Sequence, residues 1–451
     1  MNIAQNSRRL REDFAKVLAV LEKTPPIDKH RQVELPEFQA RTAHVQGLLA
    51  REGVDVGFVF SDEHYCGDVP YLGGNCNISV EQVAGVVGKT GCHIIAGLEG
   101  GYVAEQLSPR AGAVVHKVEM LQLADEEYPV EAETLEAVLT VANGGTLPRR
   151  IGLMTPRQVI PAQVVDYLRA GFGAENIVDI QQGYQQIKYE KSDREMALIA
   201  DAALIADAVM EAMLVVLRPG LLETQVAAWG HFVAKELGAE ELGFDIMVGA
   251  NEANRTLIGK ALNREIHLGD YVHLGVGTKR DGLNACIRRS VIAAPSPAAV
   301  TPEQRYWFDL VEGAYRVGFD SYVEVAQQNL PARVQEQALV DYFAAHSAEV
   351  SQRAGRPLQL ERLKPYTGTH NAGYTECQEF YGAITLSSDA PLGRQIVTML
   401  DVALRGIGNY WDDVVIPGFD FLVVENTLGK YGPRVETLTK LPINVQEYVK
   451  F

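Results

Sequence analysis

The stretch from Gly269 to Ser290, GDYVHLGVGTKRDGLNACIRRS, constrains the fold of this chain more than any other segment. Its pattern predicts two β-strands joined by a tight turn. The second strand carries Cys286, Arg288 and Arg289. Because side chains two residues apart lie on one face of a strand, Cys286 and Arg288 share a face and Arg289 points to the other. The question is which kind of site this hairpin supports.

The hairpin lies among long helical segments. Residues 188–217 place apolar side chains at a spacing of three to four residues with almost no helix breakers, which predicts a long amphipathic helix that ends at Arg218-Pro219-Gly220. Further helices are predicted at 223–239, 302–323 and 334–355. Strands are predicted at 393–406 and 409–428. The order helix, helix, strands, helix, helix, strands predicts an α+β domain in which helices back an antiparallel sheet.

The first part of the chain has a different organisation. Short apolar runs such as 54–61 and 84–91 are typical of buried strands, and they alternate with helical segments, which indicates an α/β domain. We therefore expect two domains, residues 1–185 and 186–451, as a length of 451 residues also favours. The Gly- and Asn-rich segment 65–77 is a surface loop or a ligand-binding element, with Asn75 as a candidate contact.

Composition excludes several classes of partner. A net charge of −17 argues against nucleic acid and against anionic membrane surfaces, which both favour clustered Lys and Arg. The N-terminal segment has charges at helical spacing and no apolar core, so we do not expect a signal peptide, and no run approaches the roughly 20 apolar residues of a membrane span. Five cysteines without a CxxC pair fit a reduced, cytoplasmic protein.

Four motifs occur in order along the second half of the chain: LRPGLLETQVAAW, LGDYVHLGVG…DGLNACIRRSVI, YTGTHNAGY and LGRQIVTMLDVAL. Together they resemble the pita-bread creatinase/aminopeptidase P family, M24, over residues 186–451. The resemblance implies a pita-bread C-terminal domain, a curved antiparallel sheet backed by helices, preceded by a creatinase- or prolidase-like α/β domain. It also implies a homodimer with its active sites near the subunit interface.

The metal-dependent members of that family hold two ions with Asp, Asp, His, Glu and Glu. By resemblance these positions correspond, in order, to Gly275, Cys286, His370, Asp401 and Glu425, with Phe419 beside Asp420 as a second option for the last. Gly275 cannot ligate and Cys286 carries a thiol, so most of the negative charge that holds two divalent cations is missing. We therefore expect no metal and no other cofactor. A single ion on Cys286, His370 and Asp401 stays open, because these groups suit zinc.

The leading hypothesis is a metal-independent, creatinase-like hydrolase that cleaves a C–N bond, amide or amidino, in a small polar molecule. The creatinase mechanism does not carry over intact, because the loop that holds the catalytic His in creatinase has Asn254, Arg255 and Thr256 at its centre here. The small Gly275 is expected to leave room for a ligand. Proton transfer, nucleophilic attack or orientation would come from His370, His273, Cys286, Glu425 and Asp401. Substrate contacts would come from Arg288, Glu379, Tyr381, Asn254 and Asn75.

Two other functions stay open. One is an atypical single-metal hydrolase or lyase similar to Xaa-Pro peptidases, and the other is a non-catalytic binding protein on a degraded peptidase frame. Each candidate residue also has a structural interpretation. His273 fits an interior histidine bonded to the backbone, Cys286 a small core residue, and Arg288 a salt bridge in the vacated metal position.

Overall fold

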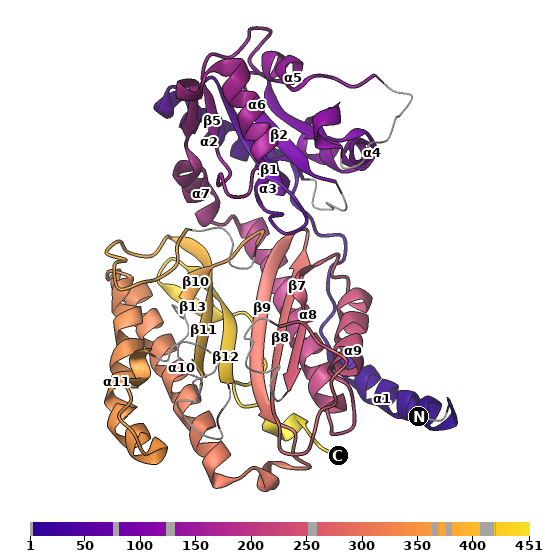
Figure 1. Cartoon of the computed structure of the whole chain (residues 1–451), viewed down its shortest axis with the longest axis vertical. Coiled ribbons are helices and arrows are strands. Elements are labelled where there is room, and N and C mark those ends of the chain that lie inside the picture. Colours follow the sequence, from indigo (N-terminus) through magenta and orange to yellow (C-terminus); the bar gives the residue numbers. More distant parts are fainter. Residues whose placement is uncertain are drawn as a thin grey trace. The chain divides into compact units, whose positions relative to one another are not determined.

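The computed structural model describes residues 3–74, 81–122, 131–250, 259–362, 369–375, 381–405, 419 and 421–451. The chain forms two compact units (Figure 1). The C-terminal unit comprises Met1–His30, Lys191–Ala372 and Gly382–Phe451, and the N-terminal unit comprises Arg31–Glu190 and Gly373–Tyr381. This division differs from a single cut between residues 185 and 186, since the first helix groups with the C-terminal unit and a short later segment groups with the N-terminal one.

The N-terminal unit is an α/β domain around a six-stranded mixed sheet in the order β4-β3-β2-β1-β5-β6. Its strands are β1 Val56–Ser61, β2 Val83–Gly88, β3 Gly91–Ala96, β4 Val114–Lys117, β5 Ile151–Leu153 and β6 Ile177–Asp179. Its helices and 3₁₀ turns are α2 Leu35–Glu52, α3 Asp68–Gly73, α4 Leu98–Leu107, η1 Ser108–Ala111, η2 Glu119–Leu121, α5 Leu135–Ala142, α6 Ala162–Phe172, η3 Ala174–Asn176 and α7 Gln181–Tyr189. The predicted α/β class is confirmed.

A chain of polar side chains crosses two strands of this sheet. One ring nitrogen of His93 on β3 lies 2.8 Å from the Thr90 hydroxyl, and the other lies 2.9 Å from His116 on β4. His116 in turn contacts the Glu133 carboxylate at 2.9 Å. Burial, aided by the neighbouring His116, lowers the pKa of His93 to about 4. His93 is therefore neutral at physiological pH.

This lowered pKa predicts acid sensitivity. A His that is neutral when folded, but titrates near 6.5 when unfolded, binds its proton first in the unfolded chain. Stability should therefore fall as pH drops from about 6.5 to about 4 and should not respond to His93 above that window. The thermal unfolding midpoint of a His93→Gln variant should depend less on pH across this range than that of the unmodified chain. The exposed His44, replaced in the same way, is the control; equal slopes for both variants would disprove the assignment.

The C-terminal unit is built on a seven-stranded sheet in the order β10-β11-β12-β9-β8-β7, with β13 paired to β12. Its strands are β7 Leu242–Ala250, β8 Tyr271–Arg280, β9 Leu283–Ile292, β10 Thr369–Asn371, β11 Gln395–Arg405, β12 Phe421–Tyr431 and β13 Arg434–Thr437. Its helices and 3₁₀ turns are α1 Ile3–Lys23, α8 Asp193–Val216, α9 Glu223–Glu236, η5 Pro297–Ala299, α10 Pro302–Gln328, α11 Arg333–Ala354, η6 Leu360–Arg362 and η7 Gln446–Tyr448. Every pairing between these strands is antiparallel, as the sequence predicts.

Helices pack against one face of this sheet. Alternate residues of β8, namely Val272, Leu274 and Val276, join a buried apolar cluster with α8 and α9. A second cluster joins α10 and α11 to β11 and β12. The residues between these positions on the strands therefore point to the opposite face. None of the helices among the described residues has both the length and the apolar run needed to cross a bilayer.

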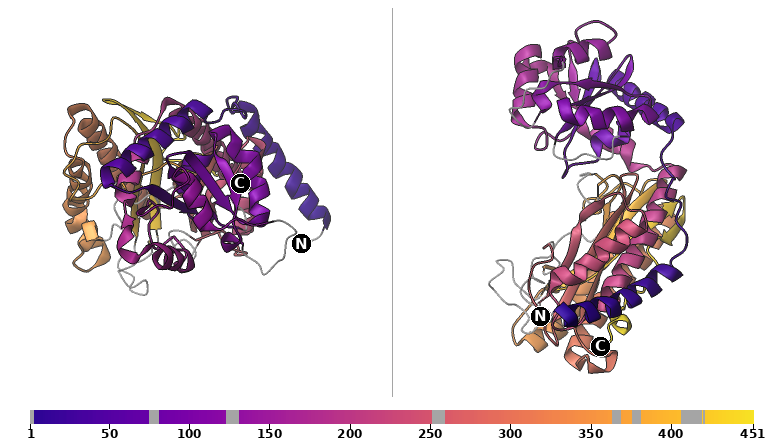
Figure 2. Two further views of the ribbon diagram at one scale, coloured as in Figure 1. Left: turned by 90° about the horizontal axis from the view of Figure 1, so that it is seen from above. Right: turned by 90° about the vertical axis from the view of Figure 1, so that its right-hand side faces the viewer.

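Helix α1 belongs to this unit through a buried ion pair. Asp13 on α1 is almost fully buried, and the guanidinium of Arg218 donates to both its carboxylate oxygens, at 2.8 and 3.1 Å. Figure 2 shows α1 lying along the helical layer of the unit, with the N-terminus at the outer end of the helix. The sequence pattern predicted a helical character for this segment but did not assign it to the second half of the chain.

Two of the sequence motifs have structural roles. Glu223, in the first turn of α9, is fully buried, and its carboxylate accepts hydrogen bonds from the N–H groups of Ala250 and Leu262, both at 2.9 Å. This ties the start of α9 to the end of β7. In the hairpin, Asp281 and Gly282 both have positive φ, 49° and 80°, as the two-residue turn between antiparallel strands requires. The predicted hairpin is confirmed.

Candidate functional site

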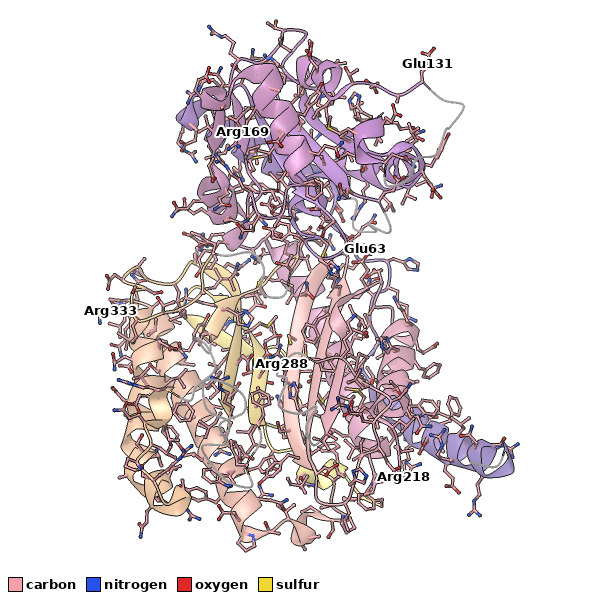
Figure 3. All side chains as sticks on the ribbon, in the orientation of Figure 1. Glu63, Glu131, Arg169, Arg218, Arg288 and Arg333 are labelled. Atoms are coloured by element: carbon pink, nitrogen blue, oxygen red, sulfur yellow. The ribbon has the colours of Figure 1, made fainter. Side chains whose placement is uncertain are left out.

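A row of cross-strand neighbours runs over the face of the sheet that the helices leave uncovered. Its members share one register and lie on five adjacent strands: Met247, Gly275, Arg288, Glu425 and Asp401. Directly opposed residues on paired strands have Cβ atoms about 5 Å apart, so their side chains interact. We call Arg288, Glu425 and Asp401 the charged row. Figure 3 labels Arg288 over the strands of the C-terminal unit.

Arg288 makes ion pairs with both acids of the charged row. Its Nε lies 3.1 Å from Glu425 Oε2, and its Nη1 donates to Asp401 Oδ2 at 3.2 Å. The three side chains are 6%, 0% and 2% exposed, respectively. Buried charges are costly unless they are paired, so the guanidinium and the carboxylates stabilise one another in the charged state. Arg289, its sequence neighbour, points to the helical face as expected.

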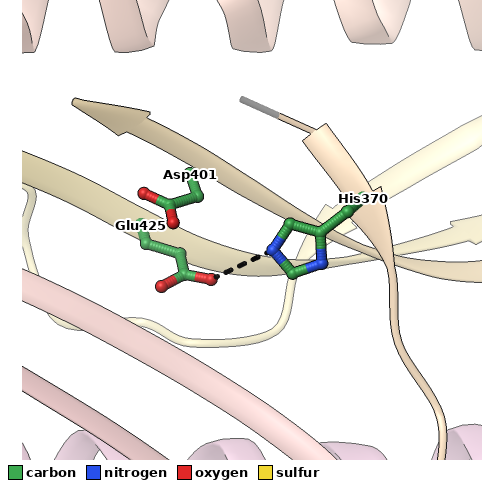
Figure 4. A group of neighbouring side chains, drawn as sticks. All are labelled: His370, Asp401 and Glu425. Carbon is green, nitrogen blue, oxygen red and sulfur yellow. Dashed lines mark ion pairs between the residues drawn. The ribbon is translucent and has the colours of Figure 1, made fainter. Parts of the chain in front are cut away.

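His370 on β10 approaches the charged row from the other edge of the sheet. Its Nε2 lies 3.9 Å from Glu425 Oε1 (Figure 4), and single ligand atoms of His370, Asp401 and Glu425 all lie within 4.8 Å of one another. Its Nδ1 lies 3.2 Å from the carbonyl oxygen of Asn371. A carbonyl can only accept, so Nδ1 carries the proton, and in the neutral imidazole Nε2 presents its lone pair toward Glu425.

Cys286 lies two residues before Arg288 on β9, on the same face of the sheet. Its thiol donates to Glu425 Oε2 at 3.2 Å, and its side chain is fully buried. Its backbone N–H donates to the hydroxyl of Thr427 on β12 at 2.8 Å, which fixes the register at this point. The thiol, the imidazole and both carboxylates therefore converge around Glu425.

The space beside Gly275 is filled by neighbouring side chains. A Cβ at this position would lie 3.1 Å from Met247 Sδ and 3.5 Å from Arg288 Cγ. At Gly277 a Cβ would lie only 2.9 Å from the ring of Phe244. The expectation that Gly275 leaves room for a ligand is therefore corrected, because the stem of Arg288 passes where a larger residue would stand.

His273 lies farther along the same face of the sheet. It pairs with Ser290, two residues from the pair formed by Gly275 and Arg288. Its ring packs edge to face on Phe421 at a centroid distance of 5.1 Å, and it is 2% exposed. It does not belong to the group of three ligands around Glu425, and its catalytic role stays a prediction.

Of the four other expected substrate contacts, the structure describes Tyr381. Tyr381 belongs to the N-terminal unit, where its ring packs edge to face on Tyr189 at 5.2 Å. Asn75, Asn254 and Glu379 lie outside the described residues. The strand expected at 409–428 corresponds to β12, which begins at Phe421. Phe419, the second option for the fifth ligand position, is also described.

Sequence reasoning did not identify two residues near the charged row. The ring of Phe244 on β7 lies 5.6 Å from the guanidinium carbon of Arg288, within the range of a cation–π contact. The Thr427 hydroxyl accepts a hydrogen bond from the Cys286 N–H and donates one to the Cys286 carbonyl oxygen, both at 2.8 Å. Thr427 could have been found by counting two residues from Glu425 along one strand face, whereas Phe244 gave no signal.

Sequence comparison places part of the chain in a known family. Residues 197–338 match the model of metallopeptidase family M24. The uncharacterized peptidase YqhT of Bacillus subtilis is 24% identical over 247 residues, which cover 54% of this chain and 64% of that protein. An Xaa-Pro dipeptidase of Pyrococcus horikoshii is 24% identical over 162 residues, covering 36% of this chain and 45% of that protein. The chain thus matches less than two thirds of the length of either relative.

Solved structures share the whole architecture. An Xaa-Pro dipeptidase from Bacillus anthracis superimposes with a TM-score of 0.68 over 91% of this chain and 99% of its own, at 17% identity. The prolidase from Pyrococcus horikoshii gives a TM-score of 0.68 over 91% and 100%, at 14% identity. At such low identity the similarity shows the fold alone. It confirms the predicted order of an α/β domain followed by a pita-bread domain.

Proposed function

We propose that this chain, whose residues 197–338 match metallopeptidase family M24, hydrolyses a C–N bond in a small, peptide-like substrate at the charged row. The observation that carries the proposal is the convergence of His370, Asp401 and Glu425, whose ligand atoms lie within 4.8 Å of one another. Three polar side chains from three different strands meet at one buried point of the sheet. The curated relatives named as Xaa-Pro dipeptidases suggest dipeptides as the first substrates to test.

A two-ion centre does not fit these residues. Two divalent cations need several bridging carboxylates, and two of the five positions hold Gly275 and Cys286. Arg288 adds a positive charge in contact with both remaining carboxylates. The loss of negative charge and the gain of a guanidinium both weaken the binding of two divalent cations.

A single ion fits the donor set. One imidazole and two carboxylates are ligands that zinc accepts, and His370, Asp401 and Glu425 would hold it with ligand atoms that lie within 4.8 Å of one another. Cys286 is not one of these three residues, and its thiol contacts Glu425 Oε2, whereas His370 Nε2 faces Glu425 Oε1. The contact of His370 Nδ1 with a backbone carbonyl is also the support that histidine ligands usually have.

Each residue then has a role in the reaction. When bound, a divalent ion supplies polarisation of the scissile carbonyl and a water of lowered pKa. Glu425 and Asp401 would supply negative charge at the centre of the site, and His370 would supply its Nε2, which lies 3.9 Å from Glu425 Oε1. Burial of the charged row excludes bulk water and strengthens every electrostatic interaction within it.

The metal-independent, creatinase-like hydrolase is a second candidate, and the ion pairs of Arg288 favour it. The guanidinium already supplies the positive charge that neutralises Asp401 and Glu425. In this version Arg288 orients a small amide or amidino substrate, and His370, His273 or Cys286 transfers the proton or acts as nucleophile. No divalent ion would be required.

One assay separates the candidates. Protein purified without chelator is offered a panel of Xaa-Pro dipeptides and a panel of small amidino and amide compounds, each with and without 1,10-phenanthroline. The single-ion hydrolase should cleave dipeptides, lose activity with the chelator and regain it with added zinc. The metal-independent hydrolase should cleave the small compounds regardless of chelator. Binding of either panel without any cleavage would support the third possibility, a non-catalytic binding protein.

Several wider expectations are carried forward as predictions. These are the homodimeric state, the cytoplasmic location, the boundary near residue 185 and the substrate contacts from Asn75, Asn254, Glu379 and Tyr381. Size measurement in solution tests the first of these. Alanine variants at the four contact positions should raise KM rather than lower kcat, because they are expected to hold substrate and not to take part in the chemistry.

A further inference from the structure

Arg288 contacts both of the carboxylates that an ion would need. Its guanidinium contacts Asp401 Oδ2 and Glu425 Oε2 at 3.2 and 3.1 Å, and these two residues belong to the three-ligand group with His370. A divalent cation and a guanidinium in contact with the same carboxylates repel each other strongly in a buried site. A bound ion and Arg288 therefore oppose each other at Asp401 and Glu425.

Arg288 also contacts an aromatic ring in the position in which it pairs with the two acids. The ring of Phe244 lies 5.6 Å from its guanidinium carbon, and the face of an aromatic ring attracts a cation. Gly277 allows Phe244 to lie this close to the sheet, because a Cβ there would meet the ring at 2.9 Å. A Cβ at Gly275 would lie 3.5 Å from Arg288 Cγ, in ordinary contact with its stem. Both glycines lie on β8, next to the strand that carries Arg288.

We propose that Arg288 is a built-in competitor of the divalent ion at this site. The guanidinium neutralises Asp401 and Glu425 when no ion is bound, and its charge opposes the binding of an ion to the same two carboxylates. This inference rests on the proposed single-ion function and adds its regulation. A site built in this way keeps its buried carboxylates paired in the absence of metal, so folding does not depend on the ion, and occupancy responds to the ion concentration.

Replacement of Arg288 by methionine tests the competition directly. Methionine keeps the unbranched stem but removes the charge, so zinc alone, titrated into the metal-free variant by calorimetry, should bind at least tenfold more tightly than to the unmodified chain. The thermal unfolding midpoint of the metal-free variant should fall, because two buried carboxylates lose their counter-charge, and zinc should restore it. The zinc-induced rise in the midpoint should be larger for the variant than for the unmodified chain.

Lys279→Met is the matched control. Lys279 is also a buried cation on this hairpin, and it pairs with Glu241 at 3.3 Å, away from the charged row. Its removal should leave zinc affinity unchanged. If Arg288→Met does not fold, Arg288→Lys serves instead, because a lysine keeps the charge but cannot bridge two carboxylates as the planar guanidinium does, so a smaller gain in affinity is expected.

The outcomes distinguish the inference from the function on which it rests. Equal or weaker zinc binding by Arg288→Met, with one ion bound by the unmodified chain, would overturn the competition and leave the single-ion function standing. Zinc binding by the variant but not by the unmodified chain would support the competition while directing the function toward the metal-independent candidate. No binding by either protein would overturn both.

Discussion

Replacement of Glu425 by glutamine is expected to lower kcat/KM about 10³-fold or more and to abolish tight zinc binding, with little change in fold. Glu425 contacts three other members of the site: Arg288 at 3.1 Å, Cys286 at 3.2 Å and His370 at 3.9 Å. Glutamine has the same shape but no charge, so it weakens both the hold on a cation and the pairing with Arg288.

The measurement combines steady-state kinetics, calorimetric zinc titration and circular dichroism. Glu436→Gln is the control, because Glu436 is a partly exposed glutamate on the neighbouring strand β13 and pairs with Arg434. It should leave kinetics and zinc binding unchanged. A Glu425→Gln enzyme that retains its activity within threefold would show that the centre of the reaction lies elsewhere.

Arg289→Met is expected to lower the free energy of unfolding by about 3–5 kcal/mol, because several buried acceptor oxygens would lose their charged hydrogen-bond donor. The Arg289 guanidinium is fully buried on the helical face of the sheet, and its N–H groups donate five hydrogen bonds. The acceptors are the carbonyl oxygens of Pro442, Arg288, Glu425 and Leu441 and the Asn426 side chain, all at 2.6–2.8 Å. Methionine would satisfy none of them.

Burial lowers the pKa of Arg289 to about 10, so the guanidinium is still charged at neutral pH and its bonds are charge-assisted. Urea denaturation measures the loss of stability, and the exposed Arg434→Met should change stability by less than about 0.5 kcal/mol. A loss below about 1 kcal/mol for Arg289→Met would mean that the network is not a determinant of the fold. Adjacent arginines thus have separate roles, one in structure and one in the site.

Local patterns predict much of this molecule. The turn at Asp281 and Gly282 and the long helix before Arg218 follow from residue spacing and from residues that suit those conformations. The alternation of side chains along β9 also predicts that Arg288 and Arg289 point to opposite faces. These features depend on residues close to one another in the sequence, where short-range geometry decides the outcome.

The charged row could not be derived in this way. Arg288 and Glu425 are 137 residues apart, and only the pairing of β9 with β12 brings them opposite each other. The sequence predicted that one of the two arginines pairs with an acid. It did not predict that one guanidinium contacts both Asp401 and Glu425. Met247 and Phe244, which fill the space around Gly275 and Gly277, likewise come from a strand whose register contains irregularities that no local pattern predicts.

The central claim is that a frame known for metallopeptidases here supports a site for a single ion. Elemental analysis by mass spectrometry, on protein purified without chelator and then saturated with zinc, tests it most directly. We expect one divalent ion per chain, and loss of that ion in a His370→Ala variant that remains folded. Two ions per chain, or none at saturating zinc, would contradict the account.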